Sequence, residues 1–489
     1  MTRVMTNHID VRTANGSVRG LDRGGSIVFY AIPYAAAPTG ELTFALPTPP
    51  DPWTVVRDAT RPGPTAQCRV ADGTIPEPSL PGTDILTVNV FTPDPSPTAS
   101  MPVLVWFHGG AYIAGSPISP WYDGYSFNQS GIVVVTVGYR LGVMVFGLVP
   151  DAPPNRAVHD WLAALRWVRE NIGTFGGDPD RVTIAGQSAG GGAVLTLLGV
   201  EGIAGLASQA VACSPVFTQM TTTTAAAAMD EIAGLLGKPG TAEELAEVSN
   251  TELDSVVWRM KNAFGAAPDA AGPGTDAVNL VQCVLNSLQL SPLLDDELIQ
   301  TSVSGAALSL EARDIPLLIG STAEEFNGLI PEQVHFAEPA AALNALGVRE
   351  SAARRYLGCR ADRTGSSLVG QVLTDLMVRS SIAGLAEQRD RTWVYDFRWR
   401  GNGQVDPGLA FHCLDLPFAW NVTERATRVT GPTPTGLAHD VHTALTEFVR
   451  SGDPGWSPYG DDRTTRYFDE SSGDRNQGYL AELTLSGIS

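Results

Sequence analysis

The stretch Val182-Thr183-Ile184-Ala185-Gly186-Gln187-Ser188-Ala189-Gly190 decides the fold that we expect for this chain. Its first four residues predict a short strand, and Gly191–Leu198 after it has the composition of a helix. Between them stands the only G-x-S-x-G motif in the sequence. Small residues are needed at positions 186 and 190, because strand and helix approach closely around a serine on such a turn. The pattern predicts that Ser188 is a nucleophile on a strand-to-helix elbow.

The sequence around this elbow alternates between buried strands and helices. Residues 102–108 (PVLVWFH) and 132–139 (IVVVTVGY) are nearly continuous apolar runs, as in strands that are covered on both faces. Residues 156–174 carry apolar side chains at helical spacing. Strand signals return at 316–319 (PLLI) and 393–397 (WVYDF). This order predicts an α/β fold with a central, mostly parallel twisted sheet flanked by helices.

The 489 residues show no repeat and no linker that would separate independent domains. We therefore expect one domain over 1–489, with helical insertions at about 218–312 and 326–390 that cover the active site. The patch 221–228 (TTTTAAAA) is interpreted as a helix start with threonine caps, and 240–258 as a helical tract. The insertions are expected to supply the walls of the pocket.

The charge balance and the scarcity of lysine exclude several classes of function. With 32 Lys and Arg against 52 Asp and Glu, the net charge is −20, which disfavours nucleic acid and anionic membranes as partners. The only lysines are Lys238 and Lys261, and neither completes an S-x-x-K pair or a P-loop. S-x-x-K hydrolases and P-loop nucleotidases are thereby excluded.

Export signals and membrane spans are also missing from the sequence. The first 16 residues contain no apolar segment of the secretory type, and no run of 18 uncharged apolar residues occurs. The five cysteines are odd in number and widely spaced, without C-x-x-C pairs, which predicts free thiols and no metal site. We therefore expect a cytoplasmic protein that needs no disulfide and no cofactor.

A glycine-rich loop follows the strand predicted at 102–108. Acyl transfer requires N–H donors that point at the developing oxyanion, and backbone groups on such a loop supply them. The sequence His108-Gly109-Gly110-Ala111 fits this requirement. We assign the oxyanion hole to the N–H groups of Gly109, Gly110 and Ala189, and expect His108 to be a buried structural residue.

Several separated motifs, in one order along nearly the whole chain, resemble those of the type-B carboxylesterase/lipase family. This family belongs to the α/β-hydrolases and includes bacterial p-nitrobenzyl esterases and the cholinesterases. The matching segments are Tyr30–Ala35, Leu86–Phe91, the glycine loop, Tyr139–Gly142, Asn155–Pro179, the elbow, Gly320–Glu325 and Phe411–Phe418. The resemblance implies a Ser-His-Glu triad with Glu325 as the acid and His412 as the base.

The residues support these two assignments independently, though they leave alternatives open. In α/β-hydrolases the chain order is Ser, then acid, then His, so the histidines after Ser188 qualify as the base. Their positions are His335, His412, His439 and His442. His335 lies in a polar loop, and the last two are interpreted as the solvated face of a helix. A slip of one residue in the family register would make Glu324 the acid instead of Glu325.

Several positions depart from the family pattern. Ile85 stands where many secreted relatives have a disulfide cysteine, so Cys68 lacks that partner. Gln187 replaces a glutamate that is common at the elbow, and Trp161 replaces a common glutamine. Pro215 follows Ser214 where glycine is usual, which leaves the role of Ser214 beside the triad open.

Together these features predict a serine carboxylesterase that acts on a small-molecule ester through an acyl-enzyme. A lipase and an amide or carbamate hydrolase are alternatives, because the triad does not choose its leaving group. A non-catalytic binding protein on the same fold is a further alternative. Against it stands the presence of Ser188, Glu325 and His412 together with a glycine loop. The sequence predicts no particular oligomeric state and no particular substrate.

Overall fold

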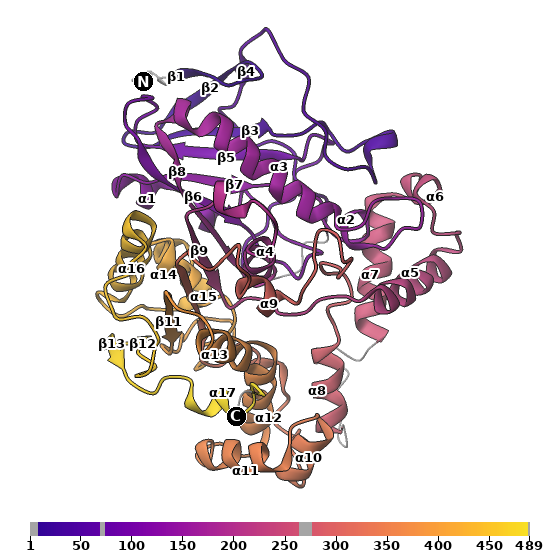
Figure 1. The fold of residues 1–489 in the computed structure, drawn as a ribbon, viewed down its shortest axis with the longest axis vertical. Coiled ribbons are helices and arrows are strands. Elements are labelled where there is room, and N and C mark those ends of the chain that lie inside the picture. The colour runs from indigo at the N-terminus through magenta and orange to yellow at the C-terminus, as the bar shows by residue number, and fades with distance from the viewer. Residues whose placement is uncertain (1–7, 69–73, 264–275, 488–489) are drawn as a thin grey trace.

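A large sheet, parallel in its middle, runs through the molecule (Figure 1). The computed structural model describes residues 8–68, 74–263 and 276–487. In these residues the strand order is β1-β2-β3-β5-β7-β6-β8-β9-β10-β11-β12-β13, with β4 paired to β2. Neighbours from β7 to β12 are parallel, the other neighbours in this order are antiparallel, and β4 pairs with β2 in parallel. The strands are β1 (His8–Arg12), β2 (Ser17–Asp22), β3 (Ile27–Pro33), β4 (Arg57–Asp58), β5 (Thr87–Thr92), β6 (Met101–Phe107), β7 (Val133–Val137), β8 (Gly177–Gln187), β9 (Gln209–Cys213), β10 (Leu317–Thr322), β11 (Thr392–Phe397), β12 (Thr465–Phe468) and β13 (Gly473–Arg475).

The middle strands are apolar throughout because both of their faces are covered. In β6, Val103 and Val105 belong to one hydrophobic core, and Leu104 and Trp106 belong to the other. Successive side chains of a strand point to opposite faces, so such a strand must be apolar at every position. The continuous run at 102–108 therefore predicted the environment of β6 correctly.

Helices flank the sheet and form an outer layer around its carboxyl end. Figure 1 shows α5, α6 and α7 on one side and α8, α10, α11 and α12 at the end opposite β1 and β2. The helices are α1 (Tyr125–Gln129), α2 (Val143–Phe146), α3 (Arg156–Asn171), α4 (Ala189–Leu197), α5 (Thr222–Leu236), α6 (Ala242–Ala246), α7 (Asn250–Ala263), α8 (Ala277–Leu285), α9 (Val303–Ala307), α10 (Pro339–Ala345), α11 (Glu350–Cys359), α12 (Gly365–Thr374), α13 (Ser380–Ala386), α14 (Leu416–Ala419), α15 (Thr427–Thr430), α16 (Leu437–Ser451) and α17 (Leu480–Leu483). The predicted mostly parallel sheet with flanking helices is confirmed.

A third, smaller hydrophobic core joins distant parts of the chain at the end of the molecule opposite β1 and β2. It contains Val281 of α8, Leu343 of α10, Tyr356 of α11 and Leu373 of α12, all buried. Ala481 of α17 packs into the same cluster. The last turns of the chain are thus held against the second insertion. The single domain over 1–489, with insertions at 218–312 and 326–390, stays a prediction.

The sequence made two predictions about helices in the first insertion. The threonine-capped start is confirmed, since Thr221 accepts a hydrogen bond from the Thr224 N–H at 3.2 Å and caps α5. The helical tract expected at 240–258 consists of two helices, because α6 ends at Ala246 and α7 begins at Asn250. The Ser249 hydroxyl accepts from the Glu252 N–H at 3.2 Å, so this serine starts a second helix.

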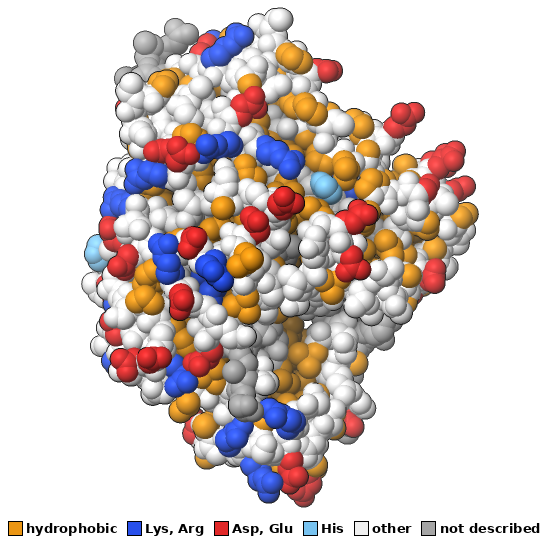
Figure 2. All heavy atoms as spheres, viewed as in Figure 1, with side chains coloured by type: hydrophobic (Ala, Val, Ile, Leu, Met, Phe, Trp, Pro, Cys, Tyr) orange, Lys and Arg blue, Asp and Glu red, His pale blue; other side chains and the backbone are white. Residues whose placement is uncertain are grey.

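Charged side chains of both signs lie on the visible face of the molecule. Figure 2 shows Lys and Arg interspersed with Asp and Glu on its left and lower parts, and mainly Asp and Glu on its right part. All five cysteines lie in the described part of the chain and are unpaired. None of the helices among the described residues is both long and apolar enough to cross a bilayer.

Candidate active site

Ser188 lies on a strained turn between β8 and α4. Its φ of 57° and ψ of −122° are unfavourable for a residue with a side chain, and strain of this kind is typical of active sites. A Cβ added to Gly186 would lie 2.3 Å from the Gly190 carbonyl oxygen, and one on Gly190 would lie 2.0 Å from the Phe107 carbonyl oxygen. Both positions therefore require glycine. The Ser188 N–H donates to the Cys213 carbonyl at 2.9 Å, which holds the turn against β9.

His412 is held by Glu325 from the loop that follows β10. Its Nδ1 lies within hydrogen-bond distance of Glu325 Oε2, and its backbone N–H donates to the Glu325 carbonyl at 3.0 Å. The other carboxylate oxygen of Glu325 accepts from the Ser214 hydroxyl at 2.6 Å and from the Thr322 N–H at 2.8 Å. The glutamate side chain is fully buried. Three donors therefore fix this carboxylate, and the carboxylate fixes the imidazole.

The opposite ring nitrogen of His412 faces the elbow. Its Nε2 lies 3.1 Å from the amide nitrogen of Gln187. Because an amide N–H₂ only donates, this contact requires an unprotonated Nε2, and the ring proton then sits on Nδ1 toward Glu325. Among the described residues the Ser188 hydroxyl makes no hydrogen bond to His412. Such bonds are often long in unliganded enzymes and tighten when substrate binds.

The surroundings of His412 and His108 shift the pKa values of these two histidines in opposite directions. Burial by itself would lower the pKa of His412, but the adjacent Cys413 side chain and the Glu325 carboxylate at Nδ1 raise it well above the usual value of 6.5. In His108 burial dominates and lowers the pKa to about 4. Its Nδ1 lies 2.8 Å from the Gly109 carbonyl, and its ring stacks on Tyr139. His108 is thus the buried structural residue that the sequence predicted.

Glu324 points away from the histidine and holds a different set of donors. Its carboxylate accepts from Arg363 at 2.8 Å, from Arg400 at 2.8 and 3.0 Å, and from the Ala410 N–H at 3.1 Å. The Glu324 N–H in turn donates to the Ala410 carbonyl at 2.9 Å. Glu324 therefore ties the loop that carries Glu325 to the loop segment just before His412. The two neighbouring carboxylates have separate partners.

The glycine loop after β6 lies directly against the elbow. A Cβ on Gly109 would be 2.8 Å from the Gln187 carbonyl oxygen and 3.2 Å from the Ser188 Cβ. The N–H groups of Gly109, Gly110 and Ala189 donate to no acceptor within the described part of the chain. Ala189 is the first residue of α4, where N–H groups have no partner within the helix. These donors are free to bind an oxygen atom of a ligand.

A cavity with a volume of about 340 Å³ opens onto Ser188 and His412. Its walls come from both insertions, with Trp258, Val284 and Leu288 from the first. Phe326, Leu329 and Met377 come from the second, and most of the lining is apolar. Residues of both expected insertions therefore line the cavity, but Ile75, Glu77, Ala111 and Ile113 from outside them form part of its walls as well. Small apolar groups would be buried well in such a space.

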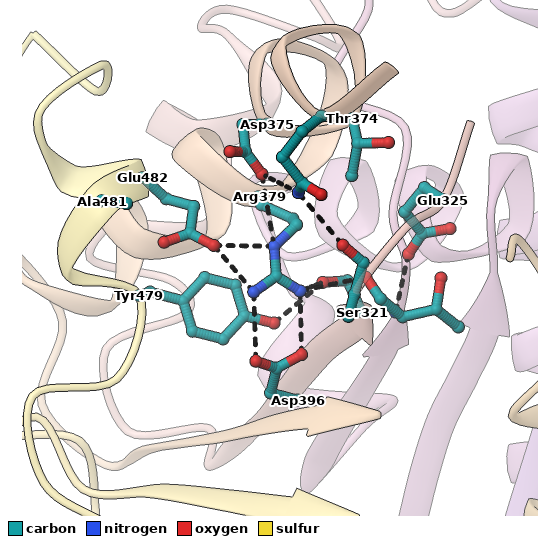
Figure 3. A network of polar contacts seen from close by, with 12 residues as sticks. Ser321, Glu325, Thr374, Asp375, Arg379, Asp396, Tyr479, Ala481 and Glu482 are labelled. Carbon is teal, nitrogen blue, oxygen red and sulfur yellow. Dashed lines mark hydrogen bonds and ion pairs between the residues drawn. The ribbon is translucent and has the colours of Figure 1, made fainter. Parts of the chain in front are cut away.

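A buried network of charges supports the loop that carries Glu325 (Figure 3). Arg379 donates to both carboxylate oxygens of Asp396 at 2.9 and 3.1 Å and to Glu482 of α17 at 2.8 Å. Its Nη1 also donates to the Thr322 carbonyl at 3.0 Å. The N–H of the same Thr322 donates to Glu325. Arg379 thus connects α17 to the turn that carries Thr322 and Glu325.

Arg379 lies in a π-helical turn, Asp375–Arg379, between α12 and α13. Its guanidinium also stacks over Tyr479, 4.3 Å from the ring centre. Met377 of the same turn lines the cavity. π-Turns are often found at functional sites, since the extra residue redirects neighbouring side chains. This turn therefore directs a charge into the core and an apolar side chain toward the pocket.

The other histidines lie away from Ser188. His335 and His439 are exposed. The interpretation of His442 as part of a solvated face is wrong, because its side chain is buried and its Nδ1 lies 2.8 Å from the Ala419 carbonyl. His442 stands three residues before Leu445, so both occupy the buried face of α16. Among the described residues no group of three or more His, Cys, Asp or Glu is placed to hold a metal.

Sequence reasoning missed the partners of the site or left them open. Ser214, whose role the following proline had put in doubt, contacts Glu325, and Gln187 contacts His412. Ser214 directly follows β9, the neighbour of the elbow strand, which is a signal that it could reach the site. Arg379 carried no such signal, because its partners are spread over more than 100 residues of sequence.

A nucleophile elbow at the carboxyl end of a parallel strand, an acid–histidine pair beside it and a covering layer of helices define an α/β-hydrolase. The comparisons with known proteins agree. The model of the Carboxylesterase family matches residues 7–482. Para-nitrobenzyl esterase of Bacillus subtilis (strain 168) is 33% identical over 477 residues, which cover 92% of this chain and 91% of the relative. Phenmedipham hydrolase of Pseudarthrobacter oxydans is 30% identical over 468 residues, covering 90% of each chain.

Solved structures lead to the same family. A PNB esterase structure superimposes with a TM-score of 0.84 at 28% identity, covering 98% of this chain and 99% of the other. The chain belongs to the carboxylesterase family, and it is a carboxylic ester hydrolase of the serine type.

Proposed function

We propose that Ser188 is the nucleophile of this esterase, that His412 is its general base and that Glu325 orients and stabilises the imidazole. One observation carries the proposal: Ser188 and His412 line the same cavity, and Nδ1 of that histidine faces Glu325. With the proton on Nδ1, Nε2 carries a lone pair, which accepts from the Gln187 amide in the unliganded structure. When substrate binds, Gln187 releases this lone pair, and Nε2 takes the serine proton as the hydroxyl attacks the ester carbonyl. The imidazolium then protonates the leaving alcohol.

The oxyanion of the tetrahedral intermediate binds to the N–H groups of Gly109, Gly110 and Ala189. These donors are unused by the described residues and lie beside Ser188, so no rearrangement of the backbone is needed. Water then attacks the acyl-enzyme, with His412 again as the base. Neither a metal nor a cofactor enters these steps.

The substrate is a small-molecule carboxylic ester whose apolar part fits the cavity, and nucleic acid and membrane are not partners. The mostly apolar lining supports this substrate class. We place the enzyme in the cytoplasm of a bacterium, which the five free thiols and the bacterial relatives support. Lipase action and amide or carbamate hydrolysis would appear in the same assay with other substrates.

The test is Ser188→Ala, assayed with a p-nitrophenyl ester. Without the nucleophile kcat should fall about a millionfold, which corresponds to about 8 kcal/mol of transition-state stabilisation. The matched control is Ser208→Ala, since this serine precedes β9 at the opposite end of the strands from Ser188 and bonds only the Val182 carbonyl. It should keep its activity. A phosphonate inhibitor should label the Ser188 peptide in mass spectrometry, and labelling elsewhere or residual activity of a few per cent would contradict the covalent mechanism.

A further inference from the structure

The active-site cavity contains one carboxylate that takes no part in the proposed chemistry. Glu77 lines the cavity together with Ser188 and His412. Among the described lining residues it is the only acid, and none of them is Lys or Arg. A carboxylate is rarely placed in an apolar cavity without a partner, because burial disfavours its charged form.

The backbone around Glu77 is anchored, so the side chain has a fixed origin. Prolines stand on both sides of it, at 76 and 78, and restrict the chain. The Ser116 hydroxyl donates to the Pro78 carbonyl at 2.7 Å. Two residues further, Leu80 exchanges hydrogen bonds with Thr65, at 3.0 Å from its N–H and 3.1 Å to its carbonyl. The scaffold therefore presents Glu77 to the cavity from a defined position.

Among the described residues, no Lys or Arg side chain compensates this carboxylate. Within the described part of the chain Glu77 has no hydrogen bond and no salt bridge. The titratable groups that interact with it electrostatically are Cys68, Tyr122 and Tyr139, all of them uncharged at neutral pH. Burial raises the pKa of Glu77 to about 7. Its charge is thus only half formed near neutral pH and would be favoured by a positive group in the cavity.

We propose that Glu77 is a specificity residue that binds a positively charged ammonium group of the ester substrate. The proposal rests on the esterase function proposed for Ser188, and it names the substrate class: esters that carry a cation within the cavity. An ammonium group beside Glu77 gains an ion pair in a poorly hydrated space, and a neutral group of the same shape gains only apolar contact. An anionic substrate would be repelled.

The test compares substrates that differ only in charge. One pair is p-nitrophenyl 6-(trimethylammonio)hexanoate and p-nitrophenyl 7,7-dimethyloctanoate, with the charge on the acyl side. The other pair is 3-(trimethylammonio)propyl acetate and 4,4-dimethylpentyl acetate, with the charge on the alcohol side. The quaternary nitrogen does not titrate, so any pH dependence of the preference belongs to the protein.

In at least one pair, kcat/KM of the wild type should favour the cationic ester at pH 8, and Glu77→Gln should reduce that preference about ten- to hundredfold. The preference should be present above pH 7, where Glu77 is ionised, and should decline below it. The titration of His412 affects kcat/KM of both esters equally, so it cancels in the ratio of the two kcat/KM values. The control is Glu170→Gln, which changes the net charge equally on the exposed surface of α3 and should leave the preference unchanged.

Binding separates this proposal from the proposed function. Calorimetry of hexyltrimethylammonium with Ser188→Ala protein needs no catalysis, and adding Glu77→Gln should weaken binding at least tenfold. Equal binding by the two proteins, or an equal loss of kcat/KM for both members of each ester pair, would overturn the role of Glu77. Tight binding that depends on Glu77, in a wild type that hydrolyses none of the four esters, would overturn only the esterase proposal.

Discussion

Replacing Glu325 by glutamine, beside the same change at Glu324, tests the acid of the proposed triad. The two residues are adjacent and equally buried, but only Glu325 faces His412. Its carboxylate accepts three hydrogen bonds, from His412, Ser214 and Thr322. A glutamine offers one acceptor oxygen and one N–H₂ group in the same space, so one side must receive a donor where it needs an acceptor.

Each orientation of the new amide has a measurable cost. If the oxygen stays with Thr322 and Ser214, the N–H₂ group faces Nδ1 of His412 and forces the ring proton onto Nε2, which then cannot accept the serine proton. A tautomer error of this kind reduces kcat about ten-thousandfold, or about 5.4 kcal/mol. If the amide turns over, two donors meet at the Thr322 N–H, and the free energy of unfolding falls by about 1 to 3 kcal/mol.

Glu324→Gln removes a charge from a site where two arginines can return to water. The side chains of Arg363 and Arg400 are 20% and 54% exposed, so they can be hydrated when the carboxylate is lost. We expect kcat within about tenfold of the wild type, because no catalytic group loses a partner. The assay measures kcat with a p-nitrophenyl ester and the free energy of unfolding in urea for both variants. A large loss of kcat in Glu324→Gln, with Glu325→Gln nearly unaffected, would show that Glu324 is the acid.

Two further predictions concern titration and the buried charges. The pKa of His412 is raised, and its neutral form is the active one, so kcat/KM should rise with pH through a midpoint above 6.5. A flat profile from pH 5 to 8 would exclude histidine as the base. Arg379→Met removes the buried cation that Asp396 and Glu482 share and leaves them only Arg398 and Arg360, which are partly exposed, so the free energy of unfolding in urea should fall by about 3 to 5 kcal/mol. The exposed Arg313→Met serves as the control, and a loss below about 1 kcal/mol for Arg379→Met would contradict this account of the network.

Several central strands of the sheet could be predicted because they are buried on both faces. The continuous run of apolar residues in β6 fits a strand that is covered on both faces. The elbow after β8 is marked by glycines at positions where a side chain would clash with the backbone. The helical insertion was harder, since propensity alone did not reveal the break between α6 and α7 at Ser249. Local preferences are weak there and packing decides the boundary.

The predicted site residues are brought together by the fold, but their partners were beyond the sequence. Ser188 was predicted from its local motif, whereas Glu325 and His412 were expected from the family resemblance, with the chain order in support, and their catalytic roles stay proposals. Glu77 is preceded and followed by proline, and nothing in such a segment indicates that its side chain enters the cavity of Ser188. Its unusual proton affinity depends on what surrounds it in space, which a local pattern does not encode.

The sequence by itself determined the class of fold, the elbow and the glycine loop, because each depends on a short segment whose sterics or hydrophobic pattern allow one conformation. Only the tertiary structure decided which of two adjacent glutamates faces His412, since consecutive loop side chains diverge and their partners come from other parts of the chain. It also decided that Arg379 links α17 to the turn that carries Thr322 and Glu325, over a separation of 103 residues to Glu482. Contacts at such distances in sequence arise from packing of the whole sheet and its insertions, which no single segment specifies.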